Sequence, residues 1–105
     1  MSKTNKASKA SIIRVVRMTF TEEALPQFDA IFKKHEKAIG GQHGCLKVEL
    51  VKDSKDPLVR ATISRWDSEE SLNNYRRSEL FGEVWPVTKR LFAKPPEATS
   101  YINLY

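Results

Sequence analysis

Apolar and polar residues repeat along the chain with two different periods, and the order of these periods predicts the fold. A period of two residues, rich in β-branched side chains, predicts strands over residues 12–20, 45–52, 58–66 and 98–105. Apolar spacings of three and four residues predict a helix over residues 21–39 and a second helical region over residues 67–92. The order β-α-β-β-α-β indicates a ferredoxin-like α+β fold, in which two helices cover one face of a four-stranded antiparallel sheet.

Residues with known end preferences set the expected limits of the helices. Thr21 is expected to cap the first helix, and the glycine pair 40–41 is expected to end it by adopting positive φ angles. In the second region, Asp67 precedes a glutamate by three residues, which is the spacing of a capping box. A second start at Ser78 and the position of Pro86 predict that this region is broken or kinked.

The alternation in the strands also predicts which side chains share a face of the sheet. In the second strand, Leu46, Val48 and Leu50 are expected to point the same way. The face without helices is expected to carry Val15, Trp66, Tyr101 and Tyr105. Because such half-apolar surface favours burial, we expect a second copy of the chain to cover it and form a dimeric α+β barrel. A monomer with some exposed aromatic side chains is the alternative.

The composition agrees with one globular domain that follows a basic arm. A chain of 105 residues fits a single core, which we expect over residues 12–105. Residues 1–11 contain three lysines, no acidic residue and no apolar run, so we expect a flexible arm that supplies three of the five net positive charges. The other basic residues alternate with acidic ones, which does not favour a nucleic-acid partner.

The sequence also disfavours several locations and cofactors. It has no long apolar run and no secretory core, so we expect a cytoplasmic protein without membrane contact. The single cysteine, Cys45, cannot form an internal disulfide. His35 and His43 stand eight residues apart without clustered acidic residues, so we expect no metal ion. The glycine-rich segment 40–44 lacks the context of a phosphate loop or a dinucleotide site, and we expect no cofactor.

A histidine and a group of aromatic and polar residues are candidates for chemistry or ligand binding. His35 lies on the apolar stripe of the first helix, where it is either a packing residue or a general base in a cavity between helix and sheet. The aromatic side chains of the second half form either core or the walls of a pocket for an aromatic or polyketide-like ligand. The candidate ligand-binding residues are Trp66, Tyr75, Phe81 and Trp85, with Ser64 and Asn74 as polar groups that orient the ligand.

Four segments follow one another in a recognisable order: HEKAIGGQHGCLKVEL, a DP turn, a strand ending in SRW, and DSEESLNNYRRSELF. This order resembles that of the antibiotic biosynthesis monooxygenase family over roughly residues 12–105. The family contains dimeric α+β barrels that act as cofactor-independent oxygenases, heme-degrading enzymes or isomerases. The resemblance implies a cofactor-independent monooxygenase of a small aromatic, quinol or polyketide-like compound. An isomerase and a non-catalytic dimeric module that binds a small molecule remain the alternatives.

The heme-degrading branch of the family is marked by three residues that this chain lacks. That branch has an asparagine in the first strand, a tryptophan in the second helical region, and a histidine ten residues later that binds the iron. At the matching positions this chain has Val16, Tyr75 and Trp85. Because the iron would have no axial imidazole, we do not expect heme degradation.

Overall fold

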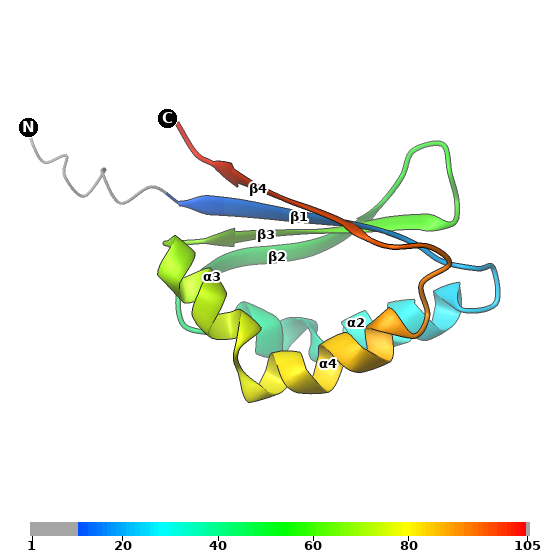
Figure 1. Ribbon diagram of the computed structural model, residues 1–105, viewed down its shortest axis with the longest axis horizontal. Coiled ribbons are helices and arrows are strands. Elements are labelled where there is room, and N and C mark those ends of the chain that lie inside the picture. Colours follow the sequence, from blue (N-terminus) through cyan, green and yellow to red (C-terminus); the bar gives the residue numbers. More distant parts are fainter. Residues whose placement is uncertain (1–10, 105) are drawn as a thin grey trace, which may run out of the picture.

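The computed structural model describes residues 11–104, which form one layer of sheet and one layer of helices (Figure 1). The elements are β1 (Ile12–Thr19), α2 (Leu25–Gly40), β2 (Cys45–Lys52), β3 (Val59–Trp66), α3 (Glu69–Arg76), α4 (Glu79–Lys89) and β4 (Glu97–Ile102). The strands pair antiparallel in the order β2-β3-β1-β4. The helices lie on one face of the sheet (Figure 1). This arrangement confirms the predicted ferredoxin-like α+β fold. Of the predicted basic arm, residues 1–10 lie outside the described part of the chain.

The core forms two clusters at opposite ends of β1. At one end, Met18 and Phe20 pack against Phe28 and Phe32 of α2, and the rings of Phe20 and Phe28 stack with centroids 4.5 Å apart. At the other end, Ile12 begins a second cluster with residues of β3 and α3. The middle of β1 therefore lies between two packed ends, and Val16 in this middle part lines a cavity.

The turn between α2 and β2 depends on Gly44 rather than on the predicted glycine pair. Gly41 has a φ angle of −87°, so the positive φ angles expected for residues 40–41 are wrong. Among the described residues, the positive φ angle lies at Gly44. Gly44 has a φ angle of +82°, and a Cβ atom there would collide with the Ser71 side chain. Its carbonyl accepts a hydrogen bond from the N–H of Asp67 at 2.8 Å. Gly44 thus ties the start of β2 to the start of α3.

The first helix begins later than predicted. The Thr21 Oγ1 accepts a hydrogen bond from the Ala24 N–H at 3.1 Å, but this bond closes a separate turn. The helix itself begins at Leu25, with Pro26 in its first turn. Proline lacks an N–H, and none is needed at this position because the first N–H groups of a helix have no partner inside it. The predicted cap therefore organises the entry to α2 rather than its first residue.

The second helical region is divided in two, as predicted, although its cap lies at a different residue. Ser68, not Asp67, caps α3, because its extended backbone lets its Oγ accept from the Ser71 N–H at 3.1 Å. The expected capping box is therefore wrong by one residue. Ser78 caps α4 in the same way, which confirms the second start. The break falls between α3 and α4, and Pro86 lies inside α4.

A bulge in β2 changes the face on which its first residues lie. The register between β2 and β3 shifts just after Cys45, which lies opposite Trp66 and packs against it. Leu46 is consequently 58% exposed and does not share the buried side of Val48 and Leu50, contrary to the prediction. The extra residue of a bulge moves every side chain before it to the other face of the strand.

Trp66 lies on the helix-covered face of the sheet, so its predicted position on the open face is wrong. It stands opposite Ile12 in the register, is 0% exposed and packs in one cluster with Leu72 of α3. The alternation of β1, β3 and β4 places Val15 and Tyr101 on the open face, as predicted, together with Ile13 and Ile63. Tyr105, which was also predicted there, lies outside the described residues.

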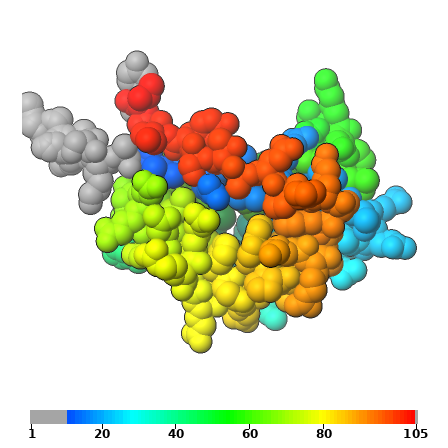
Figure 2. Space-filling model, in the orientation of Figure 1, coloured from blue at the N-terminus to red at the C-terminus, as the bar shows by residue number. Residues whose placement is uncertain are grey.

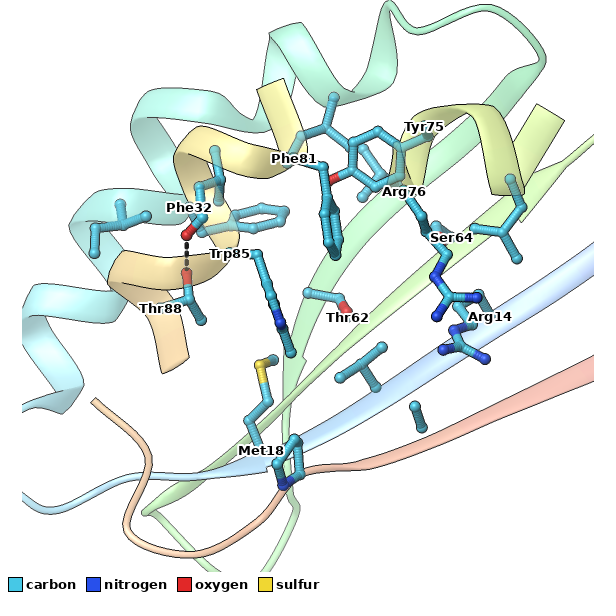
Figure 3. A pocket seen from close by; sticks show the side chains of 18 of the residues that line it. Arg14, Met18, Phe32, Thr62, Ser64, Tyr75, Arg76, Phe81, Trp85 and Thr88 are labelled. Carbon is cyan, nitrogen blue, oxygen red and sulfur yellow. Dashed lines mark hydrogen bonds between the residues drawn. The ribbon is translucent and has the colours of Figure 1, made fainter. Parts of the chain in front are cut away.

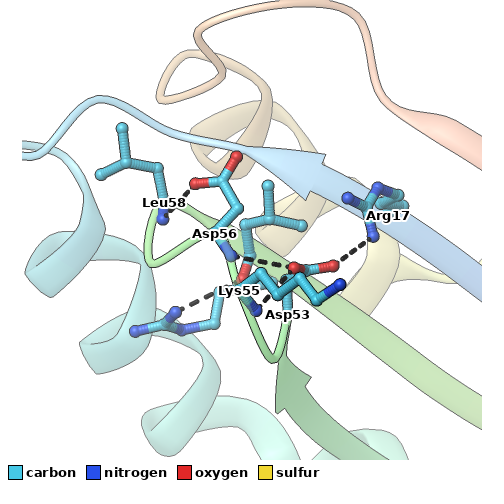
Figure 4. Close-up of polar contacts among 7 residues, drawn as sticks. Arg17, Asp53, Lys55, Asp56 and Leu58 are labelled. Carbon is cyan, nitrogen blue, oxygen red and sulfur yellow. Dashed lines mark hydrogen bonds and ion pairs between the residues drawn. The ribbon is translucent and has the colours of Figure 1, made fainter.

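A predicted hairpin joins β2 to β3, and Asp53 organises its loop (Figure 4). The Asp53 Oδ2 accepts from the N–H groups of Lys55 at 3.0 Å and Asp56 at 2.9 Å. Its Oδ1 accepts from Arg17 Nη1 at 3.0 Å. These bonds, of which those from Asp56 and Lys55 weigh most, lower the pKa of Asp53 to about 2. The loop is thus held by an ionised carboxylate.

β4 is an edge strand that ends before its predicted limit at residue 105. The strand ends at Ile102, opposite Ile12, and one further bond follows, from the Asn103 N–H to the Ser11 carbonyl at 3.1 Å. Leu104 beyond it is 82% exposed. In the described part of the chain, no helix has the length and apolar character needed to cross a membrane.

Candidate ligand-binding site

A cavity of about 260 Å³ lies between the helix-covered face of the sheet and the three helices. It is partly open to solvent, and the surface is hollowed between β4 and the helices α3 and α4 (Figure 2). The sheet contributes Arg14, Val16, Met18, Val48, Thr62, Ser64, Trp66, Ala98 and the nearby Pro96. The helices contribute Phe28, Ile31, Phe32, Ile39, Leu72, Tyr75, Arg76, Phe81, Val84, Trp85 and Thr88. The cavity and its main polar and aromatic groups are drawn in Figure 3.

The cavity exists because the floor of the sheet is made of short side chains. Val16, in the middle of β1, stands opposite Thr62 of β3 on one side and Ala98 of β4 on the other. The next helix-facing row places Ser64 and Ser100 beside Arg14. Small residues at these central positions leave a volume that the large side chains of the helices do not reach.

Aromatic rings form a continuous wall along α3 and α4 (Figure 3). The Tyr75 ring stacks on Trp66 with centroids 5.1 Å apart and meets Phe81 edge to face at 5.2 Å. Phe81 in turn stacks on Trp85 at 5.6 Å. All four predicted aromatic residues therefore line one cavity. Rings in stacked and edge-to-face contact hold one another in place and present flat ring faces on which an aromatic ligand can pack.

Several polar atoms of the wall are bonded within the protein. Ser64 Oγ accepts from Trp66 Nε1 at 3.0 Å, and Thr88 Oγ1 donates to the Val84 carbonyl at 2.9 Å. Burial, with a smaller contribution from Cys45, raises the pKa of Tyr75 to about 12. The Tyr75 hydroxyl is therefore protonated at neutral pH and can donate a hydrogen bond to a ligand but cannot act as a base.

Two arginines are the charged groups of the wall, among the residues that the structure describes. Arg14 comes from β1 and Arg76 from the end of α3. Arg14 Nη1 donates to Ser100 Oγ at 2.9 Å. Burial, and then the charge of Arg76, lower the pKa of Arg14. One end of an otherwise apolar cavity is thus positively charged.

Two predicted site residues lie outside the cavity wall. His35 is half-buried in α2 but does not line the cavity, although Phe32 and Ile39 of the same helix do. Its predicted role as a base therefore has no support from the geometry of this cavity. Asn74 is exposed, and its Oδ1 accepts from Arg77 Nη2 at 3.0 Å. Asn74 consequently faces solvent rather than a ligand.

Other cavity residues were not singled out from the sequence as site residues. Arg14, Val16 and Met18 are spaced two residues apart along β1, so their side chains share the helix-covered face. This spacing was the signal that could have identified Arg14 as a cavity residue. Arg76 gave no such signal, because it lies at the polar end of a short helix. The residues aligned with the heme-binding positions, Val16, Tyr75 and Trp85, all line the cavity.

Fold and cavity together define a class of protein: a ferredoxin-like α+β domain with an aromatic-walled cavity between its sheet and its helices. The sequence model of one family, described as antibiotic biosynthesis monooxygenase, matches residues 11–84. The chain therefore belongs to the antibiotic biosynthesis monooxygenase family, as the motifs predicted. No curated protein matches the sequence closely enough to be compared.

Solved structures show the same fold at low sequence identity. A conserved protein of Methanosarcina mazei Go1 is 22% identical, with a TM-score of 0.86 over 92% of this chain and 96% of that chain. The protein Rv0793 of Mycobacterium tuberculosis is 17% identical, with a TM-score of 0.84 over 90% of this chain and 96% of that chain. A protein described as an antibiotic biosynthesis monooxygenase is 16% identical, with a TM-score of 0.82 over 90% and 99%. At this level of identity the likeness concerns the fold alone.

Proposed function

We propose that this protein is a cofactor-independent monooxygenase that oxidises a small aromatic compound, a quinol or a polyketide-like ring system. The observation that supports it most directly is the cavity of about 260 Å³ with its wall of four aromatic rings. A cavity with flat, apolar walls and few polar groups suits a planar ligand. Membership of a family described by monooxygenation gives the reaction class.

The proposed reaction balances without a flavin or a metal ion. A phenol loses its hydroxyl proton and one ring hydrogen, gains one oxygen atom from O2 and becomes a quinone, while the second oxygen atom leaves as water. The substrate supplies all four electrons that O2 accepts. Ionisation of the phenol comes first, because a phenolate gives an electron to O2 more readily than the neutral phenol does. An apolar cavity keeps water away from the reactive intermediates that follow.

The proposed active form is a homodimer that covers the open face of the sheet. This face carries Ile13, Val15, Ile63 and Tyr101, and Tyr101 is 55% exposed. Two copies related by a two-fold axis would cover the same patch on each other, which is the commonest way in which soluble proteins bury such a surface.

Oxygen consumption by the purified protein with a panel of quinols and polyphenols tests the proposed reaction. The Ala98→Trp variant should abolish uptake, because Ala98 lines the cavity from an edge strand and a tryptophan there would fill the ligand's space. The matched Ala98→Ser variant, which hardly changes the volume, should keep it. Uptake by none of the compounds, or equal uptake by both variants, would contradict the proposal.

The same assay decides the role of His35. If His35→Ala consumes oxygen at the wild-type rate, the imidazole is not the base, as its position outside the cavity wall suggests. Loss of uptake in a variant with unchanged thermal unfolding would instead restore His35 as the base.

One observation favours a second candidate, a non-catalytic module that binds a small molecule. Among the described residues, neither a histidine nor a carboxylate lines the cavity, so no side chain of the wall is suited to remove a proton at neutral pH. Tight binding of planar ligands without oxygen consumption or isomerisation would support this candidate.

A further inference from the structure

In the described part of the chain, no carboxylate lines the cavity at its positively charged end. Arg14 and Arg76 line the wall, and in residues 11–104 the ion pairs of the protein involve neither of them. Arg14 donates one N–H group to Ser100, and its other guanidinium N–H groups can donate to a ligand. A guanidinium group is a cation that presents several N–H donors to a ligand.

In Figure 3 the side chains of Arg14 and Arg76 point toward the same end of the cavity, and both residues line it. Arg14 belongs to β1 of the sheet, and Arg76 belongs to α3, which packs on that sheet. Burial lowers the pKa of Arg14, and the charge of Arg76 lowers it further, so the two cations destabilise each other. An anionic oxygen between them would remove this repulsion and accept charge-assisted hydrogen bonds from both.

We propose that Arg14 and Arg76 bind the ionised oxygen of a phenolic ligand and thereby promote its ionisation, so that no side chain of the cavity needs to act as a base. In this step the O–H bond of the phenol breaks, the proton passes to water, and the electron pair stays on the oxygen as a negative charge between the guanidinium groups. The inference rests on the proposed monooxygenase function and names its substrate class: a planar phenol whose ring packs on the aromatic wall.

The direction of the change in the ligand's acidity separates this proposal from simple burial. An apolar cavity disfavours a charged group, so burial alone makes a bound phenol harder to ionise. Two cations within contact distance have the opposite effect. Whether bound phenol is more or less acidic than free phenol therefore reports directly on the arginines. Tyr75, with a pKa of about 12, does not ionise near neutral pH, so it does not change the measured acidity of the bound phenol.

A fluorescent phenol provides the test. The probe is 7-hydroxycoumarin, whose neutral and ionised forms absorb at different wavelengths, and 7-methoxycoumarin, which cannot ionise, is its neutral match. With the full-length wild-type protein in excess, we expect the ionisation constant of bound 7-hydroxycoumarin to increase about tenfold or more relative to the free probe. Above neutral pH, 7-hydroxycoumarin should also bind more tightly than 7-methoxycoumarin, and added salt should weaken this preference.

Variants assign the effect to the two arginines. Arg76→Met and Arg14→Met should each reverse most of the increase, whereas Arg76→Lys should keep part of it, because it keeps the charge. Arg77→Met is the matched control, because it removes the same charge from the next residue in the chain. Arg77 does not line the cavity and bonds Asn74 instead. Arg76 is exposed, so its replacement leaves the core intact even if that of Arg14 does not.

The outcomes distinguish this inference from the proposed function. If bound 7-hydroxycoumarin is no more acidic than free probe, or if Arg76→Met and Arg77→Met behave alike, the inference is wrong, whatever the oxygen assay shows. If the phenol becomes more acidic but no quinol or polyphenol drives oxygen uptake, the anion site stands and the monooxygenase proposal fails. If neither coumarin binds up to its solubility limit, the inference is wrong, and the oxygen assay alone then decides the monooxygenase proposal.

Discussion

Among single residues, Asp53 links the stability of the fold to pH. Its pKa in the folded protein is about 2, below the ordinary value of 3.8, mainly because the N–H groups of Asp56 and Lys55 bond its carboxylate. A group whose pKa is depressed by folding stabilises the protein above its unfolded pKa and loses this effect as the pH falls through its folded pKa. We therefore expect the contribution of Asp53 to be complete above about pH 4 and to disappear towards about pH 2.

Urea unfolding at about pH 5 and at about pH 2.5 checks this expectation. The Asp53→Asn variant should be less stable than the wild type at the higher pH, and the difference should shrink at the lower one. Glu23→Gln, a change at an exposed position before α2, serves as the control. An equal difference between Asp53→Asn and the wild type at both pH values would show that the charge of Asp53 is not what holds the hairpin.

The aromatic wall of the cavity could be predicted residue by residue, whereas at its charged end only Arg14 left a signal, in its strand parity, and Arg76 left none. Aromatic side chains in the second helical region were numerous enough to suggest a pocket, and Trp66, Tyr75 and Trp85 do line it. The cavity itself depends on short side chains of separate strands that meet only in the folded sheet, such as Thr62 and Ala98. No local pattern in the sequence shows that such residues will stand in one row.

At the scale of elements, the packing of β2 against α3 depends on a single glycine. Gly44→Ala should lower the free energy of unfolding by about 2 kcal/mol or more, because a side chain there meets a left-handed backbone and collides with Ser71. Gly82→Ala is the matched change in α4, where a Cβ atom meets nothing within 4 Å. It should raise the stability by about 0.5–1 kcal/mol, because alanine favours a helix interior over glycine.

Chemical denaturation of the two variants beside the wild type measures both changes, with circular dichroism to confirm that α4 is intact. Destabilisation of similar size in both would mean that the loss of glycine flexibility, rather than the close approach of Gly44 to α3, is responsible. Unchanged stability of Gly44→Ala would show that the turn can shift to admit a side chain.

The order and type of the elements could be predicted, but several boundaries and one face could not. Hydrophobic periods extend over six residues or more and survive small local changes, so every strand and helix was expected. A cap or a bulge depends on one or two hydrogen bonds, and neighbouring residues compete for them. Ser68 rather than Asp67 caps α3 for this reason, and the bulge after Cys45 reverses the orientation expected for Leu46.

For the whole molecule, the sheet has one face that the helices cover and one that they leave open. The open face is apolar at its centre, where Val15 of β1 and Ile63 of β3 stand opposite each other. The prediction of an uncovered, half-apolar face thus agrees with the fold, although it wrongly included Trp66. The alternation of residues along a strand shows which face of the sheet is apolar. It does not show what covers that face, because the covering surface comes from elsewhere.

The proposed dimer predicts that a charge at the centre of the open face separates the subunits. Ile63→Lys should weaken self-association by more than about a hundredfold, because pairing would bury an ammonium group without a partner. Sedimentation equilibrium should give the wild type twice the mass of the 12.0 kDa chain and the variant the mass of one chain. Gln27→Lys, at an exposed position of α2 on the helix side of the sheet, adds the same charge and should leave the dimer intact. A wild-type protein that sediments as a single chain at every concentration would rule out this interface, and the open face would then be solvated in the active protein.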